Sequence, residues 1–144
     1  MYFKESNYAN QAIETLELPY ATFYFLDNII ISEIAQGVTY SLEKAYPMIE
    51  MAKQIYGTDA EVGYISNRVH QYAVKPRDWM RFFKDNSCVK AVGLVSYTPV
   101  GLTNILFEKV FIPTSTKRFS SLDHAIAWTR SRIDPNPRLQ QLIG

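Results

Sequence analysis

The segment Val89-Lys90-Ala91-Val92-Gly93-Leu94-Val95-Ser96-Tyr97 is almost continuously apolar and rich in β-favouring residues. A strand that is covered on both faces needs such a run, so we predict that it forms the centre of a sheet. Thr98 and Pro99 follow as a cap and a first helical residue, which predicts a helix to about Phe111 that Pro113 prevents from continuing. A buried strand that leads directly into a helix is typical of an α/β fold.

The segments before and after this strand also alternate between predicted strands and predicted helices. Strands that are separated by helices pair in parallel through right-handed crossovers. This order of elements therefore predicts a small, mostly parallel sheet of about four to five strands with helices on both faces. The predicted elements are an edge strand at 13–18, an antiparallel hairpin at 20–26 and 29–35, a helix at 41–55 that Gly57 ends, a strand at 62–66, a helix from Pro76 to Lys84, a short extended piece after Pro113, and a last helix at 122–133. In the helix at 41–55, Pro47 either kinks the first turns or delays the start of the regular helix to about Pro47.

Composition bounds the class of protein. With 144 residues, 47% of them hydrophobic, the chain fits one domain at 13–133, with an N-terminal extension at 1–12 and a C-terminal tail at 134–144. Fifteen basic against fourteen acidic residues give a net charge of +1, which argues against general nucleic-acid binding. No run approaches the roughly 18 apolar residues that span a bilayer. The polar start at 1–7 is unlike a signal peptide, so we expect a cytoplasmic protein without a membrane span.

The residues that could carry catalysis do not combine into a site. Cys88 is the single cysteine, so neither an intrachain disulfide nor a cysteine zinc site can form. His70 follows the end of one predicted parallel strand and Cys88 precedes the start of its neighbour, so the two are too far apart for proton transfer. The glycines match neither a dinucleotide fingerprint nor a phosphate loop. We expect a non-enzymatic protein without cofactor or metal.

Four stretches carry a resemblance to a known fold: 18–25 (LPYATFYF), 64–68 (YISNR), 74–79 (VKPRDW) and the segment from Phe119 to Trp128. With the order of elements, they resemble the SpoIIAA-like fold of STAS domains, and especially the small bacterial proteins labelled STAS/SEC14-like. The resemblance covers residues 13–133. It implies a regulatory or self-associating module that works through protein contact, or alternatively a SEC14-like carrier of a small molecule or lipid.

One expected residue of that family is not matched. The anti-sigma-factor antagonists among STAS domains carry a phosphorylated serine in an Asp-Ser-x-Gly type motif after the third strand. This chain has Ile65-Ser66-Asn67-Arg68 there, without the aspartate before the serine or the glycine two residues after it. We therefore predict that Ser66 is not a regulatory phosphorylation site.

A polar loop follows the strand at 62–66. In open α/β sheets, ligands gather outside the carboxyl ends of the strands, and a helix N-terminus such as the one after Pro76 favours anions. The loop is interpreted as a contact for a small anion or phospho group, with an ordinary solvated loop and a base-specific nucleic-acid contact as the alternatives. Its candidate residues are Ser66, Asn67, Arg68, His70, Tyr72, Lys75 and Arg77.

The helix after Pro99 is apolar over an arc of about 180°, which is more than one sheet face can cover. The arc leaves out Ile105, and its members are Val100, Leu102, Leu106, Phe107, Val110 and Phe111. Three covers stay open: the C-terminal segment with Leu139, Leu142 and Ile143, a protein partner that includes a second copy of the chain, or a lipid ligand. A cavity lined by Tyr24, Tyr64 and Phe107 would favour a small-molecule carrier, and a solid core with an apolar two-fold contact would favour a homodimer.

Overall fold

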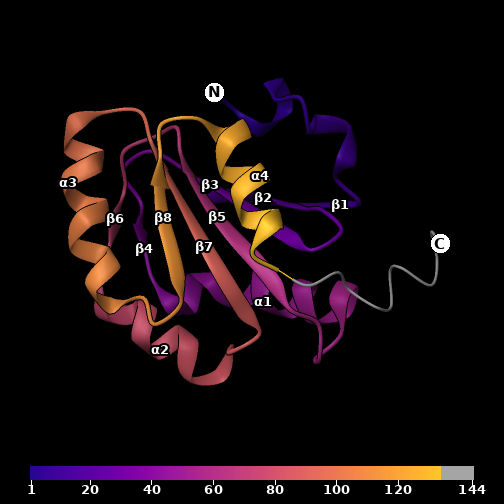
Figure 1. Ribbon diagram of the computed structural model, residues 1–144. Helices are drawn as coiled ribbons and strands as arrows, with labels where there is room; N and C mark the ends of the chain where they lie inside the picture. Colours follow the sequence, from indigo (N-terminus) through magenta and orange to yellow (C-terminus); the bar gives the residue numbers. More distant parts are fainter. Residues whose placement is uncertain (134–144) are drawn as a thin grey trace.

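A six-stranded mixed sheet forms the centre of the computed structural model, which describes residues 1–133 (Figure 1). The strand order is β1-β2-β3-β5-β7-β8. The first three strands pair antiparallel, and β3, β5, β7 and β8 pair parallel. The strands are β1 (Glu14–Leu18), β2 (Ala21–Phe25), β3 (Ile29–Ile34), β5 (Val62–Arg68), β7 (Val89–Ser96) and β8 (Ser115–Phe119).

The α/β class and the hairpin are therefore confirmed, whereas the predicted number of strands is too low. Strand β7 is a buried interior strand as expected, but it lies next to the edge strand β8, and the centre of the sheet is formed by β3 and β5. The extended piece after Pro113 is a fully paired edge strand, β8. Its sequence, Ser-Thr-Lys-Arg-Phe, is mostly exposed or half-buried and carries no apolar run, so its pattern gave no strand signal. A further pair, β4 (Thr39–Tyr40) with β6 (Ala73–Val74), forms a separate two-stranded parallel sheet that the sequence did not predict.

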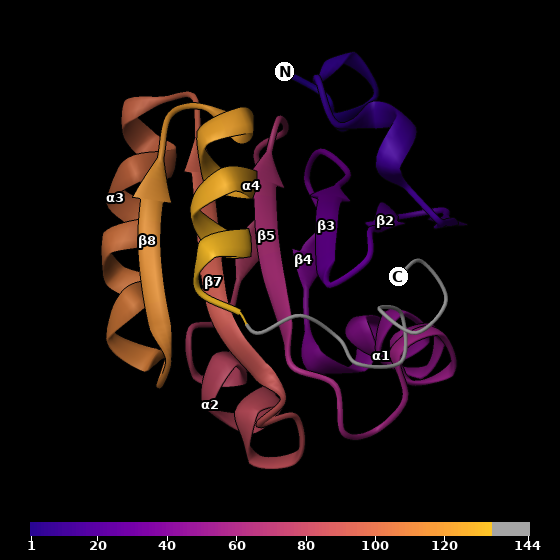
Figure 2. The ribbon, with the colours of Figure 1, turned by 45° about the vertical axis from the view of Figure 1, so that its right-hand side comes forward.

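Helices cover both faces of the main sheet, as expected. The helices α1 (Leu42–Tyr56), α2 (Arg77–Asp85) and α3 (Pro99–Glu108) pack on one face, and α4 (Leu122–Ser131) packs on the other (Figures 1 and 2). Three short 3-10 turns complete the elements: η1 (Phe3–Glu5), η2 (Ala9–Gln11) and η3 (Lys109–Phe111). Phe3 is buried on the α4 side with its ring centroid 4.5 Å from that of Tyr24, so the N-terminal segment packs onto the domain.

Local signals explain where the helices begin and end. Ser41 caps α1 by accepting a hydrogen bond from the amide of Lys44, and Gly57 ends it at a φ of 83° that favours glycine. Helix α1 begins at Leu42 and continues through Pro47, so of the two alternatives a start only near the proline is wrong. Thr98 and Ser121 cap α3 and α4 in the same way as Ser41.

Across residues 1–133, no helix is both long and apolar enough to cross a bilayer. The predicted tail at 134–144, with the covering role considered for Leu139, Leu142 and Ile143, lies outside the described residues.

Candidate functional site

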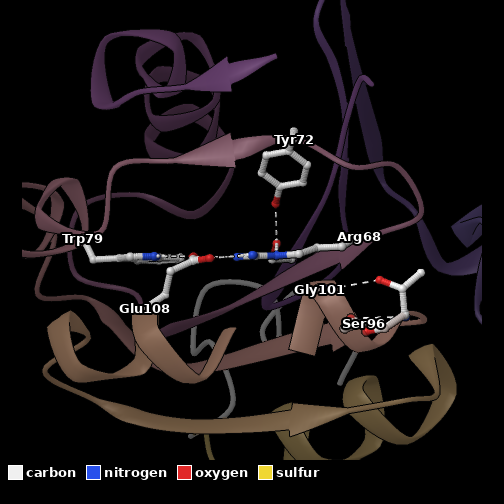
Figure 3. A network of polar contacts seen from close by, with 8 residues as sticks. Arg68, Tyr72, Trp79, Ser96, Gly101 and Glu108 are labelled. Carbon is white, nitrogen blue, oxygen red and sulfur yellow. Dashed lines mark hydrogen bonds and ion pairs between the residues drawn. The ribbon is translucent and has the colours of Figure 1, made fainter. Parts of the chain in front are cut away.

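A buried ion pair lies at the carboxyl end of β5 (Figure 3). The two Nη groups of Arg68 each donate to one carboxylate oxygen of Glu108 on α3, both at 2.6 Å. The side chains are only 7% and 4% exposed. The indole Nε1 of Trp79 on α2 donates to the same carboxylate at 3.0 Å. One strand and two helices are thus joined by a single charged group.

The pair is satisfied within the protein. Arg68 Nε donates to the Ser66 hydroxyl at 3.0 Å, and the guanidinium lies 5.3 Å from the centre of the Tyr72 ring. Burial opposes the charge of Arg68, but Tyr72 and Glu108 favour it, and the balance raises the pKa of the guanidinium above its ordinary value. Arg68 is therefore a buried cation whose charge Glu108 neutralises, and not an exposed group that awaits an anion.

The other predicted loop residues fall into separate places. The hydroxyls of Ser66 and Tyr72 share a 2.7 Å hydrogen bond beside Arg68. Asn67 and His70 belong to a second cluster under the N-terminal segment, where Asn67 Nδ2 donates to the Met1 carbonyl and His70 Nε2 lies 3.0 Å from the Tyr2 hydroxyl. Lys75 and Arg77 are exposed.

The hydroxyl of Ser66 belongs to the interior. The residue is 2% exposed, and its oxygen contacts both Tyr72 and Arg68. A phosphate on this oxygen would need to enter a closely packed region. That Ser66 is not a regulatory phosphorylation site stays a prediction.

The second cluster is centred on the buried carboxylate of Glu33. One oxygen, Oε2, accepts from the Phe3 amide at 2.7 Å and from Asn67 Nδ2 at 2.9 Å. Asn67 Oδ1 in turn accepts from the Tyr97 hydroxyl at 2.7 Å. Burial raises the pKa of Glu33 above its ordinary value of 4.5, against the opposing effect of the hydrogen bonds from Phe3 and Asn67.

This raised pKa predicts a pH dependence of stability. The folded state holds the Glu33 proton more tightly than the unfolded state, so the contribution of Glu33 is fully present below pH 4.5 and is lost as pH rises through the raised pKa. Glu33→Gln keeps an oxygen acceptor but cannot ionise. Urea unfolding should therefore show the variant gaining stability relative to the wild type as pH rises through this window. A constant difference between the two proteins across the window would contradict the prediction.

A small hollow lies between α1, α2 and the β4–β6 pair. Its cavity volume is about 50 Å³, and its walls are mostly apolar or aromatic. The lining residues include Tyr40, Ala45, Met48, Tyr64, Tyr72, Trp79 and Phe82. Tyr64 lines it, but Tyr24 is buried on the opposite face of the sheet and Phe107 is exposed. Tyr24, Tyr64 and Phe107 therefore do not line one cavity, which is the arrangement that would have favoured a small-molecule carrier.

Helix α3 presents most of its large apolar residues to solvent. Ile105, which the predicted arc left out, is fully buried, and Glu108 is 3% exposed. Leu102 and Phe111 are half-buried. The exposed members are Val100 at 65%, Leu106 at 55%, Phe107 at 62% and Val110 at 78%. We call these four residues the α3 face. Beside Phe107, residues of the 73–76 segment and Asn104 line a groove of about 210 Å³.

Neither a three-residue metal site nor a pair of His70 and Cys88 forms within the described residues. Within 1–133, no set of three His, Cys, Asp or Glu side chains is placed to bind a metal ion. Burial raises the pKa of the Cys88 thiol, which disfavours the reactive thiolate. The parallel pairing of β5 with β7 puts His70 and Cys88 beyond opposite ends of these neighbouring strands.

Comparison with known proteins gives a match for the fold alone. No family model and no curated protein matches the chain. A solved structure of an uncharacterized protein from the DUF3478 family of Shewanella loihica PV-4 is similar, with a TM-score of 0.51 and 12% sequence identity over 82% of this chain and 92% of that one. That structure is described as having a SpoIIAA-like fold. The mixed sheet with helices on both faces and this structural match together show that the chain has a SpoIIAA-like fold.

Proposed function

We propose that this chain is a non-enzymatic, cytoplasmic, STAS-like module that acts through protein contact, and that its contact surface is the α3 face. The observation that carries the proposal is the exposure of Val100, Leu106 and Phe107 on α3 and of Val110 on η3, which follows α3 directly. Burying a side chain of this kind stabilises by about 1.5 to 3 kcal/mol relative to leaving it in water. Large contiguous apolar patches are uncommon on proteins that stay monomeric, and they mark interaction sites.

The chemistry of this surface favours a second copy of the chain as the occupant. All exposed residues between Val100 and Val110 are uncharged, because Glu108 is buried and Lys109 is half-buried. Of the exposed residues in this range only Thr103 and Asn104 are polar, so the surface can pack against a second copy of itself without bringing like charges together, and a net charge of +1 gives little repulsion between copies. The groove beside Phe107 supplies a hollow next to a projecting ring, which is the arrangement that a two-fold, self-complementary contact uses.

The proposal predicts a dimer that one charge disrupts. The wild-type protein should be dimeric by light scattering at high micromolar concentration. Leu106→Glu should give a folded monomer, because a two-fold axis through the α3 face brings two carboxylates into an apolar contact without partners. Met80→Glu is the matched control, since Met80 is 54% exposed on α2 and should leave the dimer intact. A wild type that remains monomeric at this concentration would rule out self-association.

A further inference from the structure

The N-terminal segment, residues 1–11, lies beyond the carboxyl ends of β3 and β5 (Figure 2). Its backbone hydrogen bonds close its own short turns, as in the bond from the Ser6 amide to the Phe3 carbonyl. In the described part of the chain, the first backbone hydrogen bond from this end to the sheet is donated by Ile13 to Phe25. The segment is therefore folded on itself and is attached to the domain without strand pairing.

One side chain anchors the segment. Phe3 is 1% exposed and belongs to the apolar core on the α4 side, together with Tyr24 and Leu122. Its neighbours Tyr2 and Lys4 are exposed. A single aromatic side chain that enters a recess between exposed neighbours is the arrangement by which a bound peptide is anchored to a protein surface.

The domain holds the main chain of the segment through side chains. Glu33 Oε2 accepts from the Phe3 amide at 2.7 Å, and Asn67 Nδ2 donates to the Met1 carbonyl at 2.9 Å. The Tyr97 hydroxyl lies 3.3 Å from the same carbonyl. Glu33 and Asn67 are both buried and share a hydrogen bond, so the receiving groups are fixed in place. These contacts recognise an amide and a carbonyl, which every peptide has, and the recess adds selectivity for an aromatic ring.

The three receiving side chains come from one edge of the sheet. Glu33 lies near the end of β3, Asn67 near the end of β5, and Tyr97 directly follows β7. These strands are parallel neighbours, so their carboxyl ends meet at the same edge. In open α/β sheets this edge is where ligands bind. The chain's own N-terminal segment occupies the place that a ligand takes in such folds.

We propose that the N-terminal segment is an internal ligand, and that its site binds in its place a peptide segment of a partner protein. The partner peptide presents an aromatic ring at the position of Phe3, the amide of that residue to Glu33, and the carbonyl two residues earlier to Asn67. Displacement then exchanges equivalent contacts. The site shares no residue with the α3 face, so the proposal is independent of self-association there.

Fluorescence anisotropy of a labelled peptide tests the site. A peptide of residues 1–11, labelled at its C-terminal end, should bind the full-length Phe3→Ala protein in a saturable way. It should bind the wild type at least tenfold more weakly, because the tethered segment competes at high effective concentration. The same peptide with alanine in place of Phe3 should bind neither protein.

A second substitution in the Phe3→Ala protein tests the polar contacts. Tyr97→Phe should weaken peptide binding about fivefold, as expected for one lost hydrogen bond. Tyr46→Phe is the matched control, since Tyr46 is exposed on α1 and should leave peptide binding unchanged.

Hydrogen exchange of the wild type tests whether the segment opens while the sheet stays folded. The Phe3 amide should exchange at least tenfold faster than the amides of β5, since opening of the segment breaks no strand pairing. Exchange of the Phe3 amide only at the rate of β5 would overturn the proposal, because the segment would then be an integral part of the core. A Phe3→Ala protein that is unfolded by circular dichroism would overturn it for the same reason.

The remaining outcomes concern the occupant. No peptide binding to the folded Phe3→Ala protein, or equal binding of the alanine peptide, would overturn the proposal. A Leu106→Glu protein that stays dimeric, and that becomes monomeric when Phe3→Ala is added, would also overturn it, since the occupant would then be the N-terminal segment of a second copy.

Discussion

Replacing Glu108 with alanine should lower the free energy of unfolding by about 3 to 5 kcal/mol. The substitution leaves the Arg68 guanidinium buried without its counter-charge and removes the acceptor of the Trp79 indole. Breaking a buried ion pair from one side is much more costly than losing an exposed pair, because the remaining charge stays desolvated. Urea unfolding monitored by circular dichroism measures the difference.

Two controls show whether burial of the charge is the cause. Glu50→Ala removes the exposed carboxylate that lies 3.7 Å from Lys53, and it should cost less than about 1 kcal/mol. Arg68→Met combined with Glu108→Leu removes both charges, and it should restore most of the lost stability. If Glu108→Ala proves too unstable to purify, Glu108→Gln keeps the shape of the side chain and tests the same loss of charge. A cost for Glu108→Gln or Glu108→Ala no larger than that for Glu50→Ala would show that the buried pair contributes little.

Gly63→Ala should destabilise the protein by about 1 to 3 kcal/mol through overpacking between β5 and α4. A Cβ atom at position 63 would clash with Thr129 Cγ2 and would lie 3.0 Å from Ile133 Cδ1. Thr129 is fully buried, so the methyl cannot move aside into solvent. Within residues 1–133 the glycines with positive φ are Gly37 and Gly57, so Gly63 is not one of them. The cost therefore comes from contact with α4 and not from backbone strain, and the midpoint of thermal unfolding measures it.

A compensating substitution identifies the contact. Thr129→Ala removes the methyl that the new Cβ would meet, together with a buried hydroxyl that has no partner in the described chain. The double variant Gly63→Ala/Thr129→Ala should therefore be more stable than the sum of the two single changes predicts. If the stability changes of the two single variants simply add in the double variant, the cost of Gly63→Ala does not come from contact with Thr129.

The elements that the sequence predicts well are those whose signals are local. The hairpin of β2 and β3 follows from two β-favouring runs around Asp27-Asn28, and α1 follows from a serine cap, helical spacing and Gly57. Strand β8 was missed as a strand because an exposed edge needs no apolar alternation. Hydrophobicity alone predicts the wrong inward face for α3. The residues that α3 buries are Gly101, Ile105 and Glu108, of which one is charged and one has no side chain.

In the candidate site, too, features with a local sequence signal were predictable and contacts between distant residues were not. The position of Arg68 at the carboxyl end of a buried strand was predictable from the order of elements. Its pairing with Glu108 was not, because the two residues are 40 positions apart and a single glutamate in an apolar helix gives no sign that it turns inward. Tyr40 was missed for a related reason, since the β4–β6 pair that brings it to the hollow has only two residues in each strand.

The three-way contact of Arg68, Trp79 and Glu108 restricts the paths by which this sequence can change. Loss of either charged residue alone leaves the other charge buried without its partner, whereas joint replacement of the pair by apolar residues removes both charges together. Homologous chains that keep this arrangement of β5, α2 and α3 should therefore hold the arginine and the glutamate together or lack both. The two positions lie on separate elements far apart in the sequence. The presence of both residues in a chain of low identity would therefore indicate that its α3 packs against β5 and α2 in the same way.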